Sequence, residues 1–159
     1  IVHMAYEWAQ RVGDMRLLTW NNLDLDEQRL DLEQSKRRAD VHLPISDALC
    51  KMLVQQHKDF GFQAYVAPRP EPYNGAYTSY HSTDIHKLVN EVKDSAGLPK
   101  ELTALDLRRT GITEMVEAGV DTLGIMQVSG HSNPQSVKPY LVNTLKGAST
   151  ALNKRNNDK

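Results

Sequence analysis

Apolar residues recur along this chain in two rhythms. In most stretches they return every three or four positions, which places side chains on one face of an α-helix. In residues 29–34 and 41–45 they alternate with polar residues, which predicts two half-buried β-strands. The fold class is therefore α+β, mainly α-helical, with a small β-hairpin near the N-terminal end. The predicted helices cover residues 1–10, 15–19, 47–60, 83–97, 105–118 and 122–128, and another opens at Asn133-Pro134.

The helix ends are predicted from residues that cap or break helices. Ser46, Thr103 and Asp121 can each accept a backbone N–H at a helix start, and Asp14 is expected to open the short helix 15–19 after a break at Gly13. Residues 68–75 contain prolines and a glycine and read as a loop. The predicted core faces are Leu49, Met52 and Leu53; Ile85, Leu88, Val89 and Val92; and Leu105, Ile112, Met115 and Val116. The polar residues 153–159 are expected to form a flexible tail.

The stretch from Ser129 to Tyr140 combines several signals. Gly130 can adopt the left-handed conformation that ends a helix, and Asn133-Pro134 is a typical helix-opening pair. His131 is therefore expected in a turn and Tyr140 about two turns into the next helix, both facing one pocket. The alternative is a simple joint between two helices with a buried tyrosine.

Charge and composition narrow the functional classes. The net charge is −1, which is less basic than a nucleic-acid binder usually is. The charges nevertheless segregate, with an acidic stretch at 24–33 and basic groups at 36–38, 108–109 and 154–155. The single cysteine, Cys50, excludes an intrachain disulfide and a cysteine metal cluster. His81 and His86 do not share a helical face, so no metal site is predicted there.

The sequence contains no apolar run long enough to span a membrane and no signal peptide. It begins at Ile1 within an apolar helical pattern, so we interpret it as a fragment whose N-terminal part is missing.

Four separated segments together resemble one family. Arg11-Val12-Gly13-Asp14 precedes an apolar stretch ending at Trp20, and Lys36 lies on the predicted hairpin ahead of Leu43-Pro44-Ile45. Leu105-Asp106-Leu107-Arg108-Arg109-Thr110 follows, and then Ser129-Gly130-His131 and Tyr140. This order and spacing are similar to those of the tyrosine recombinases, or phage-type integrases. The resemblance covers nearly the whole chain and implies a catalytic domain over residues 1–159, without the family's N-terminal core-binding domain.

The resemblance implies a role for each matching residue. Tyr140 would attack a DNA phosphodiester and form a 3′-phosphotyrosine link, without metal, ATP or another cofactor. Arginine suits the charged phosphate because its planar fork makes bidentate contacts. Arg11 and Arg108 would hold the phosphate, with His131 as a third donor, and Lys36 would protonate the leaving 5′ oxygen. The remaining expected roles are Asp14 orienting Arg11, and Arg37, Arg38 and Arg109 contacting DNA.

Two positions depart from the family's pattern. The second box normally begins with a histidine, and this chain has Leu105 there. Leucine cannot accept a proton, so water or a histidine from the Pro68–His86 region would have to assist Tyr140, or the step is slower. Pro139 directly precedes Tyr140, and a proline inside a helix removes a backbone donor. We therefore expect Tyr140 on a kinked or loosened segment.

These features leave several functions open. The main hypothesis is a site-specific recombinase or integrase of a phage or mobile element. It would act on double-stranded DNA as a homotetramer on paired sites and be a monomer as an isolated domain. The expected location is the bacterial cytoplasm, associated with the nucleoid. The alternatives are a catalytically impaired remnant that binds DNA, a type IB topoisomerase, and a helix-turn-helix regulator built on residues 115–121.

Overall fold

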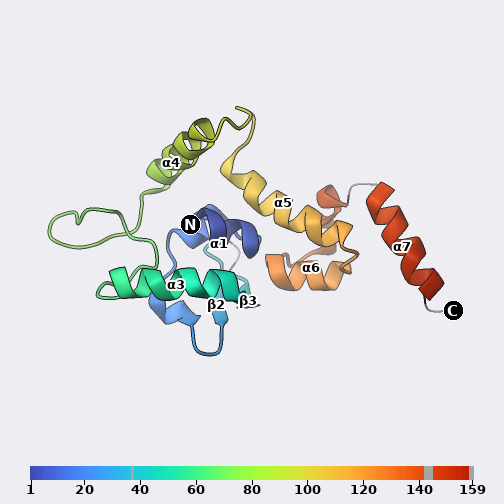
Figure 1. Cartoon of the computed structure of the whole chain (residues 1–159), viewed down its shortest axis with the longest axis horizontal. Coiled ribbons are helices and arrows are strands. Elements are labelled where there is room, and N and C mark those ends of the chain that lie inside the picture. The colour runs from blue at the N-terminus through green and yellow to red at the C-terminus, as the bar shows by residue number, and fades with distance from the viewer. Residues whose placement is uncertain (37, 142–144, 158–159) are drawn as a thin grey trace.

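The computed structural model of the chain describes residues 1–36, 38–141 and 145–157. Three short antiparallel strands lie beside α1 and α3, and α5 and α6 form the next part of the body (Figure 1). α4 extends to one side of this body, with its buried Ile85 in the main core, and α7 forms the C-terminal end. The elements are α1 (Val2–Glu7), α2 (Val12–Met15), η1 (Trp20–Asn22), β1 (Leu23–Asp24), β2 (Arg29–Glu33), β3 (Asp40–Pro44), α3 (Asp47–Phe60), α4 (Ser82–Ser95), α5 (Ala104–Glu117), α6 (Thr122–Ser129), η2 (Pro134–Ser136), η3 (Lys138–Tyr140) and α7 (Leu145–Asn157).

The predicted hairpin is confirmed. β2 and β3 pair with Leu30 opposite Leu43 and Leu32 opposite Val41, and these four side chains are buried. The intervening residues point to the other face, as the period of two requires. β1 adds a third strand that pattern analysis missed, because two residues are too few to show alternation.

The described core consists of two clusters. The larger lies between α1, the sheet and α3, and the smaller consists of Ala9, Ile112, Ile125 and Val137. The smaller cluster therefore joins the end of α1 to α5, α6 and the segment before Tyr140. The larger includes Met4, Ala5, Trp8, Val12, Met15, Leu18, Leu30, Leu32, Val41, Leu43, Ile45, Leu49, Leu53 and Val66.

α5 lies close to α1 because of a glycine. A Cβ added at Gly111 would lie 2.8 Å from the carbonyl oxygen of Tyr6. Real Cβ atoms essentially never come this close to another heavy atom outside their own residue and its neighbours. Arg108, nearly one turn before Gly111, is thereby placed against the turn that follows α1. The close packing of these two helices thus helps to place a functional side chain.

Most predicted caps are confirmed. Ser46 accepts from the backbone N–H of Leu49 at 3.2 Å, and Asp121 accepts from that of Gly124 at 2.7 Å. Thr103 and Asp106 form a reciprocal capping box at the start of α5. Gly130 has φ +68° and ends α6 in the left-handed conformation.

The helix near Arg11 differs from the prediction. α2 spans Val12–Met15 and has Arg11 at its N-cap, so the prediction of a helix over 15–19 opened by Asp14 was wrong. The reason is that the Asp14 carboxylate accepts from Ser35 of the hairpin and does not cap a helix.

Three predicted core residues are exposed. Met52 is 48% exposed because Cys50 takes the buried position beside Leu49 and Leu53 on α3. Val92 is 57% exposed because the only buried residue of α4 is Ile85, near its start. Leu105 is 45% exposed, since the buried positions of α5 are Ala104, Arg108 and Ile112.

The C-terminal part also differs. Tyr140 lies in η3, a short 3₁₀ turn after η2, and not two turns into an α-helix. Residues 153–157, predicted as part of a flexible tail, continue α7 as helix to Asn157. No helix in the described ranges has the length and apolar character needed to cross a membrane.

Candidate active site

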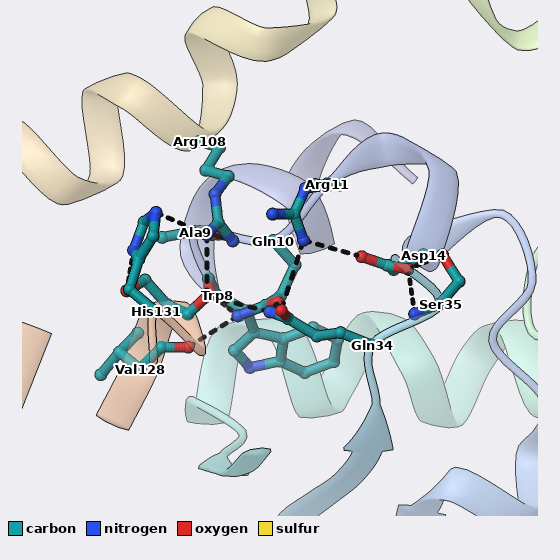
Figure 2. Close-up of polar contacts among 11 residues, drawn as sticks. Trp8, Ala9, Gln10, Arg11, Asp14, Gln34, Ser35, Arg108, Val128 and His131 are labelled. Atoms are coloured by element: carbon teal, nitrogen blue, oxygen red, sulfur yellow. Dashed lines mark hydrogen bonds and ion pairs between the residues drawn. The ribbon is translucent and has the colours of Figure 1, made fainter. Parts of the chain in front are cut away.

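Arg108 is the most deeply buried of the predicted site residues, with 2% of its surface exposed. Its Nη1 donates to the carbonyl oxygen of Ala9 and its Nη2 to that of Ser129, both at 2.8 Å (Figure 2). Burying a charge is costly unless it is hydrogen-bonded, and these two carbonyls at the ends of α1 and α6 supply that compensation. The arginine thereby joins three helices.

His131 lies directly beside this guanidinium (Figure 2). Its Nε2 is 3.3 Å from Nη2 of Arg108, and its Nδ1 is 2.7 Å from the Ser129 hydroxyl. The Ser129 hydroxyl in turn donates to the carbonyl oxygen of Ile125 at 2.6 Å. Arg108 on α5 and Ser129 at the end of α6 thus hold the imidazole by both of its nitrogens.

Tyr140 completes this side of the site. Its ring centroid is 5.9 Å from that of His131, with the planes inclined at 51°. Fully buried Val137, which packs in the smaller core cluster, anchors the 3₁₀ segment that carries the tyrosine. Tyr140 is half-buried and packs against that cluster.

Arg11 lies at the junction of α1 and α2, near Arg108. Its Nη1 donates to Gln34 Oε1 at 3.3 Å and lies 3.8 Å from Asp14 Oδ2. The other oxygen of Asp14 accepts from the backbone N–H and hydroxyl of Ser35, at 2.9 and 2.5 Å. Asp14 therefore links Arg11 to the base of the hairpin turn, a contact that sequence reasoning did not predict.

The hairpin tip is exposed. Lys36 follows Ser35 directly and lies in the turn, and in the described part of the chain no hydrogen bond joins it to Arg11, Arg108 or Tyr140. Arg38 is also exposed, with φ +49°. Arg37, predicted to contact DNA, lies outside the described residues. Arg109 is exposed on α5 and pairs with Asp106 at 3.4 Å.

The electrostatics of the site favour an anion. Burial, and after it the nearby positive charge of Arg11, lower the pKa of Arg108 to about 10, although Tyr140 and Asp14 act in the opposite direction. Arg108 therefore stays charged near neutral pH, and its charge and that of Arg11 repel each other. A phosphate between them would relieve both the repulsion and the desolvation.

The comparisons with known proteins agree with this geometry. The model of the phage integrase family matches residues 1–146, which is most of the chain. The chain belongs to the phage integrase family.

Curated relatives share low identity with this family member. A tyrosine recombinase XerC from Pediococcus pentosaceus is 19% identical over 145 residues, covering 88% of this chain and 48% of the relative. A tyrosine recombinase from Pseudothermotoga lettingae is 22% identical over 142 residues, covering 89% and 48%. The chain thus spans about half the length of these relatives.

Solved structures show the same fold. A crystal structure of XerA recombinase aligns with a TM-score of 0.75 at 19% identity, covering 96% of this chain and 54% of that one. The Tn1549 transposon integrase in complex with a circular intermediate DNA aligns with a TM-score of 0.76 at 15% identity, covering 96% and 57%. A lambda integrase dimer bound to a core site aligns with a TM-score of 0.70 at 17% identity, covering 89% and 50%. The predicted mainly helical recombinase fold is confirmed.

Two buried glutamines of this integrase-family site were missed. Gln34 is fully buried, and its Nε2 donates to Gln10 Oε1 at 2.6 Å and to the Ser129 carbonyl at 2.9 Å. Gln10, also fully buried, donates to the carbonyls of Trp8 and Val128. A Cβ at Gly130 would come within 2.6 Å of the Gln34 amide. Gly130 is therefore required both for its positive φ and for this close approach. The sequence signal for these glutamines is their position next to predicted site residues: Gln10 precedes Arg11, and Gln34 lies two residues before Lys36.

Among the described residues, no hydrogen bond or ring contact joins His81 or His86 to Tyr140. Nδ1 of His81 accepts from the backbone N–H of Thr83 and caps α4, and His86 is exposed on that helix. Leu105, at the position of the family's histidine, is partly exposed on α5. Neither Leu105 nor these two histidines therefore places a proton acceptor beside Tyr140 among the described residues.

Proposed function

We propose that this chain is the catalytic domain of a site-specific DNA recombinase, in which Tyr140 cleaves DNA by forming a 3′-phosphotyrosine bond. The observation that carries the proposal is the placement of Tyr140 beside a buried arginine and a hydrogen-bonded histidine, with a second arginine close by. Family membership agrees with this reading.

The reaction is a transesterification. The phenol oxygen of Tyr140 attacks phosphorus, a P–O bond to tyrosine forms, and the bond to the 5′ oxygen breaks. Negative charge gathers on the non-bridging oxygens, where Arg11 and Arg108 would stabilise it; losing one such donor typically costs about 10²–10³ in rate. Because the phosphodiester energy is retained in the tyrosyl link, rejoining needs no ATP.

Lys36 would supply the leaving-group proton. It lies in the exposed hairpin turn, beside a residue anchored to Asp14, so it can reach a substrate that covers the site. Arg37, Arg38 and Arg109 would contact the DNA backbone and add affinity without sequence specificity.

The partner we propose is double-stranded DNA, joined as paired sites by a tetramer of the complete protein, with the isolated domain a monomer. Related structures contain an integrase with circular intermediate DNA and a lambda integrase dimer on a core site. This supports DNA as the ligand. A bacterial or phage-encoded mobile element, acting at the nucleoid, is the setting this function implies.

A DNA-binding remnant without cleavage is the second candidate. Two observations favour it: Leu105 replaces the second-box histidine, and Tyr140 lies on a 3₁₀ turn behind Pro139. A type IB topoisomerase would use the same chemistry on single sites.

The deciding experiment traps the covalent complex. Full-length protein is incubated with its site carrying a nick beside the cleavage position, so that the short leaving strand diffuses away. Wild type should form a covalent complex visible by denaturing electrophoresis, and Tyr140→Phe should form none. If both are equally inert while both bind DNA, the remnant is the correct reading. A second assay separates the recombinase from the topoisomerase. A recombinase should join paired sites, whereas a topoisomerase should relax a supercoiled plasmid that carries no such sites.

A further inference from the structure

The missing histidine leaves the proton of Tyr140 without its usual acceptor. A phenol has an unperturbed pKa of about 10, so it is almost fully protonated near neutral pH. The side chain of Leu105 cannot accept that proton. Among the described residues the imidazole that lies against Tyr140 is that of His131, with ring centroids 5.9 Å apart.

The contacts of His131 fix where its own proton lies. Arginine has only donors, so Nε2 of His131, 3.3 Å from Arg108 Nη2, must be the acceptor of that pair. The Ser129 hydroxyl uses its hydrogen toward Ile125, so it accepts from Nδ1–H. Both contacts select the same neutral tautomer, with the lone pair of Nε2 on the side of Arg108.

We propose that His131 takes the proton of Tyr140 in this protein, and that Ser129 is a positioning residue that holds His131 in the accepting tautomer. The inference rests on the function proposed above. When a DNA phosphate enters, the Nη2–H of Arg108 that points to Nε2 turns to a phosphate oxygen, and Nε2 becomes accessible to the phenol. The O–H bond of Tyr140 breaks, an N–H bond forms at Nε2, and the phenolate attacks phosphorus. In rejoining, the imidazolium returns the proton to the departing tyrosine.

The surrounding charges suit this sequence of events. Arg108 on α5, Ser129 on α6 and Tyr140 on η3 face the imidazole, while Arg11 and Asp14 act on it through Arg108. With the phosphate bound, added negative charge stabilises the imidazolium that forms.

The test is a double-substitution cycle on full-length protein, using a nicked substrate whose 5′-bridging oxygen is replaced by sulfur. The thiolate leaves without a proton, so this reaction does not need the general acid Lys36. The rate of covalent-complex formation then depends on removal of the Tyr140 proton. His131→Gln keeps a polar side chain of similar reach but cannot take a proton, and should slow the reaction by about 10²–10⁴. Leu105→His should change wild type by less than about threefold, yet accelerate the His131→Gln variant by about tenfold or more.

Two further readouts separate this role from a structural one. The wild-type rate should fall with a slope of one as falling pH protonates the accepting imidazole of His131, and His131→Gln should lose that dependence. Ser129→Ala should slow cleavage by about tenfold at unchanged DNA affinity, because it removes one of the two contacts that select the tautomer, and Ser129→Thr should restore the rate because it keeps the hydroxyl.

Equal acceleration by Leu105→His in both backgrounds would overturn the proposal, since it would make the two positions independent. Cleavage by His131→Gln at the wild-type rate would do the same while leaving the recombinase function standing. If wild type is as inert as Tyr140→Phe, both the function and this inference fail.

Discussion

Gln34 and Arg108, far apart in the sequence, donate to the same carbonyl oxygen, that of Ser129, at 2.9 and 2.8 Å. Gln34 also accepts from Arg11 at 3.3 Å. The two arginines are therefore linked through one glutamine and one carbonyl. Because Gln34 is the first residue after β2, the same link reaches the hairpin that carries Lys36.

Replacing Gln34 should break the link between Arg11, the Ser129 carbonyl and the hairpin. Gln34→Met keeps the volume but removes the contacts to Arg11 and Ser129, so we expect covalent-complex formation to slow by about tenfold or more. Leaving buried polar partners unpaired typically costs about 1–3 kcal/mol. The measurements are single-turnover cleavage and thermal unfolding of the full-length protein.

Gln56→Met is the matched control for this substitution. Gln56 donates to the carbonyl of Val66, away from the site, so its loss should lower stability without slowing cleavage. Equal slowing by both variants would show that Gln34 matters only for the fold.

Arg108 and its neighbour Arg109 should behave very differently. Arg108→Lys loses the fork that spans the Ala9 and Ser129 carbonyls, and we expect a loss of about 10²–10³ in cleavage rate. Arg109→Lys, on the exposed side of α5, should leave the rate nearly unchanged. The rates are compared at saturating DNA. Similar losses in the two variants would contradict the assignment of Arg108 to the site.

Lys36 should be required only when the leaving group needs a proton. On an ordinary nicked substrate, Lys36→Ala should slow cleavage by about 10²–10⁴, the range usual for general acid catalysis. On the 5′-sulfur substrate it should approach the wild-type rate. A defect of equal size on both substrates would assign Lys36 to DNA binding. Arg38→Ala, in the same exposed turn, serves as the control for lost positive charge.

The capping box of α5 should make stability depend on acid pH. Backbone and hydroxyl hydrogen bonds from Thr103, with a smaller contribution from Arg109, hold the pKa of Asp106 below its usual value. Its stabilisation is therefore fully present above the unfolded-state pKa, ordinarily about 3.9, and is lost as pH falls through the lower folded-state value.

Asp106→Ala should thus reduce the free energy of unfolding near neutral pH by about 0.5–2 kcal/mol, typical of a lost cap. The difference from wild type should shrink toward zero in strong acid. Denaturant unfolding at several pH values measures it, with Asp94→Ala on exposed α4 as control. A difference that does not change with pH would exclude the charged form of Asp106 as its source.

Local signals predicted much of the fold. Alternation of apolar residues located β2 and β3, and the side chains of Ser46 and Asp121 marked the starts of α3 and α6. Such features depend on a few neighbouring residues, so they can be recognised without knowing what the chain packs against. Leu105 shows where this reasoning fails, because whether a helical face is buried depends on elements far along the chain.

The sequence by itself provided the candidate residues for the proposed phosphoryl transfer and their order, because box spacing is a property of the linear chain. Only the tertiary structure decided how they are held together. Asp14 binds the hairpin at Ser35, Gln34 joins Arg11 to the Ser129 carbonyl, and the Ser129 hydroxyl lies within hydrogen-bond distance of His131. Most of these contacts join segments separated by tens of residues, and even the short-range pair Ser129–His131 is set by the turn at Gly130. Hydrogen-bond geometry in a buried site arises only when packing has brought the partners together.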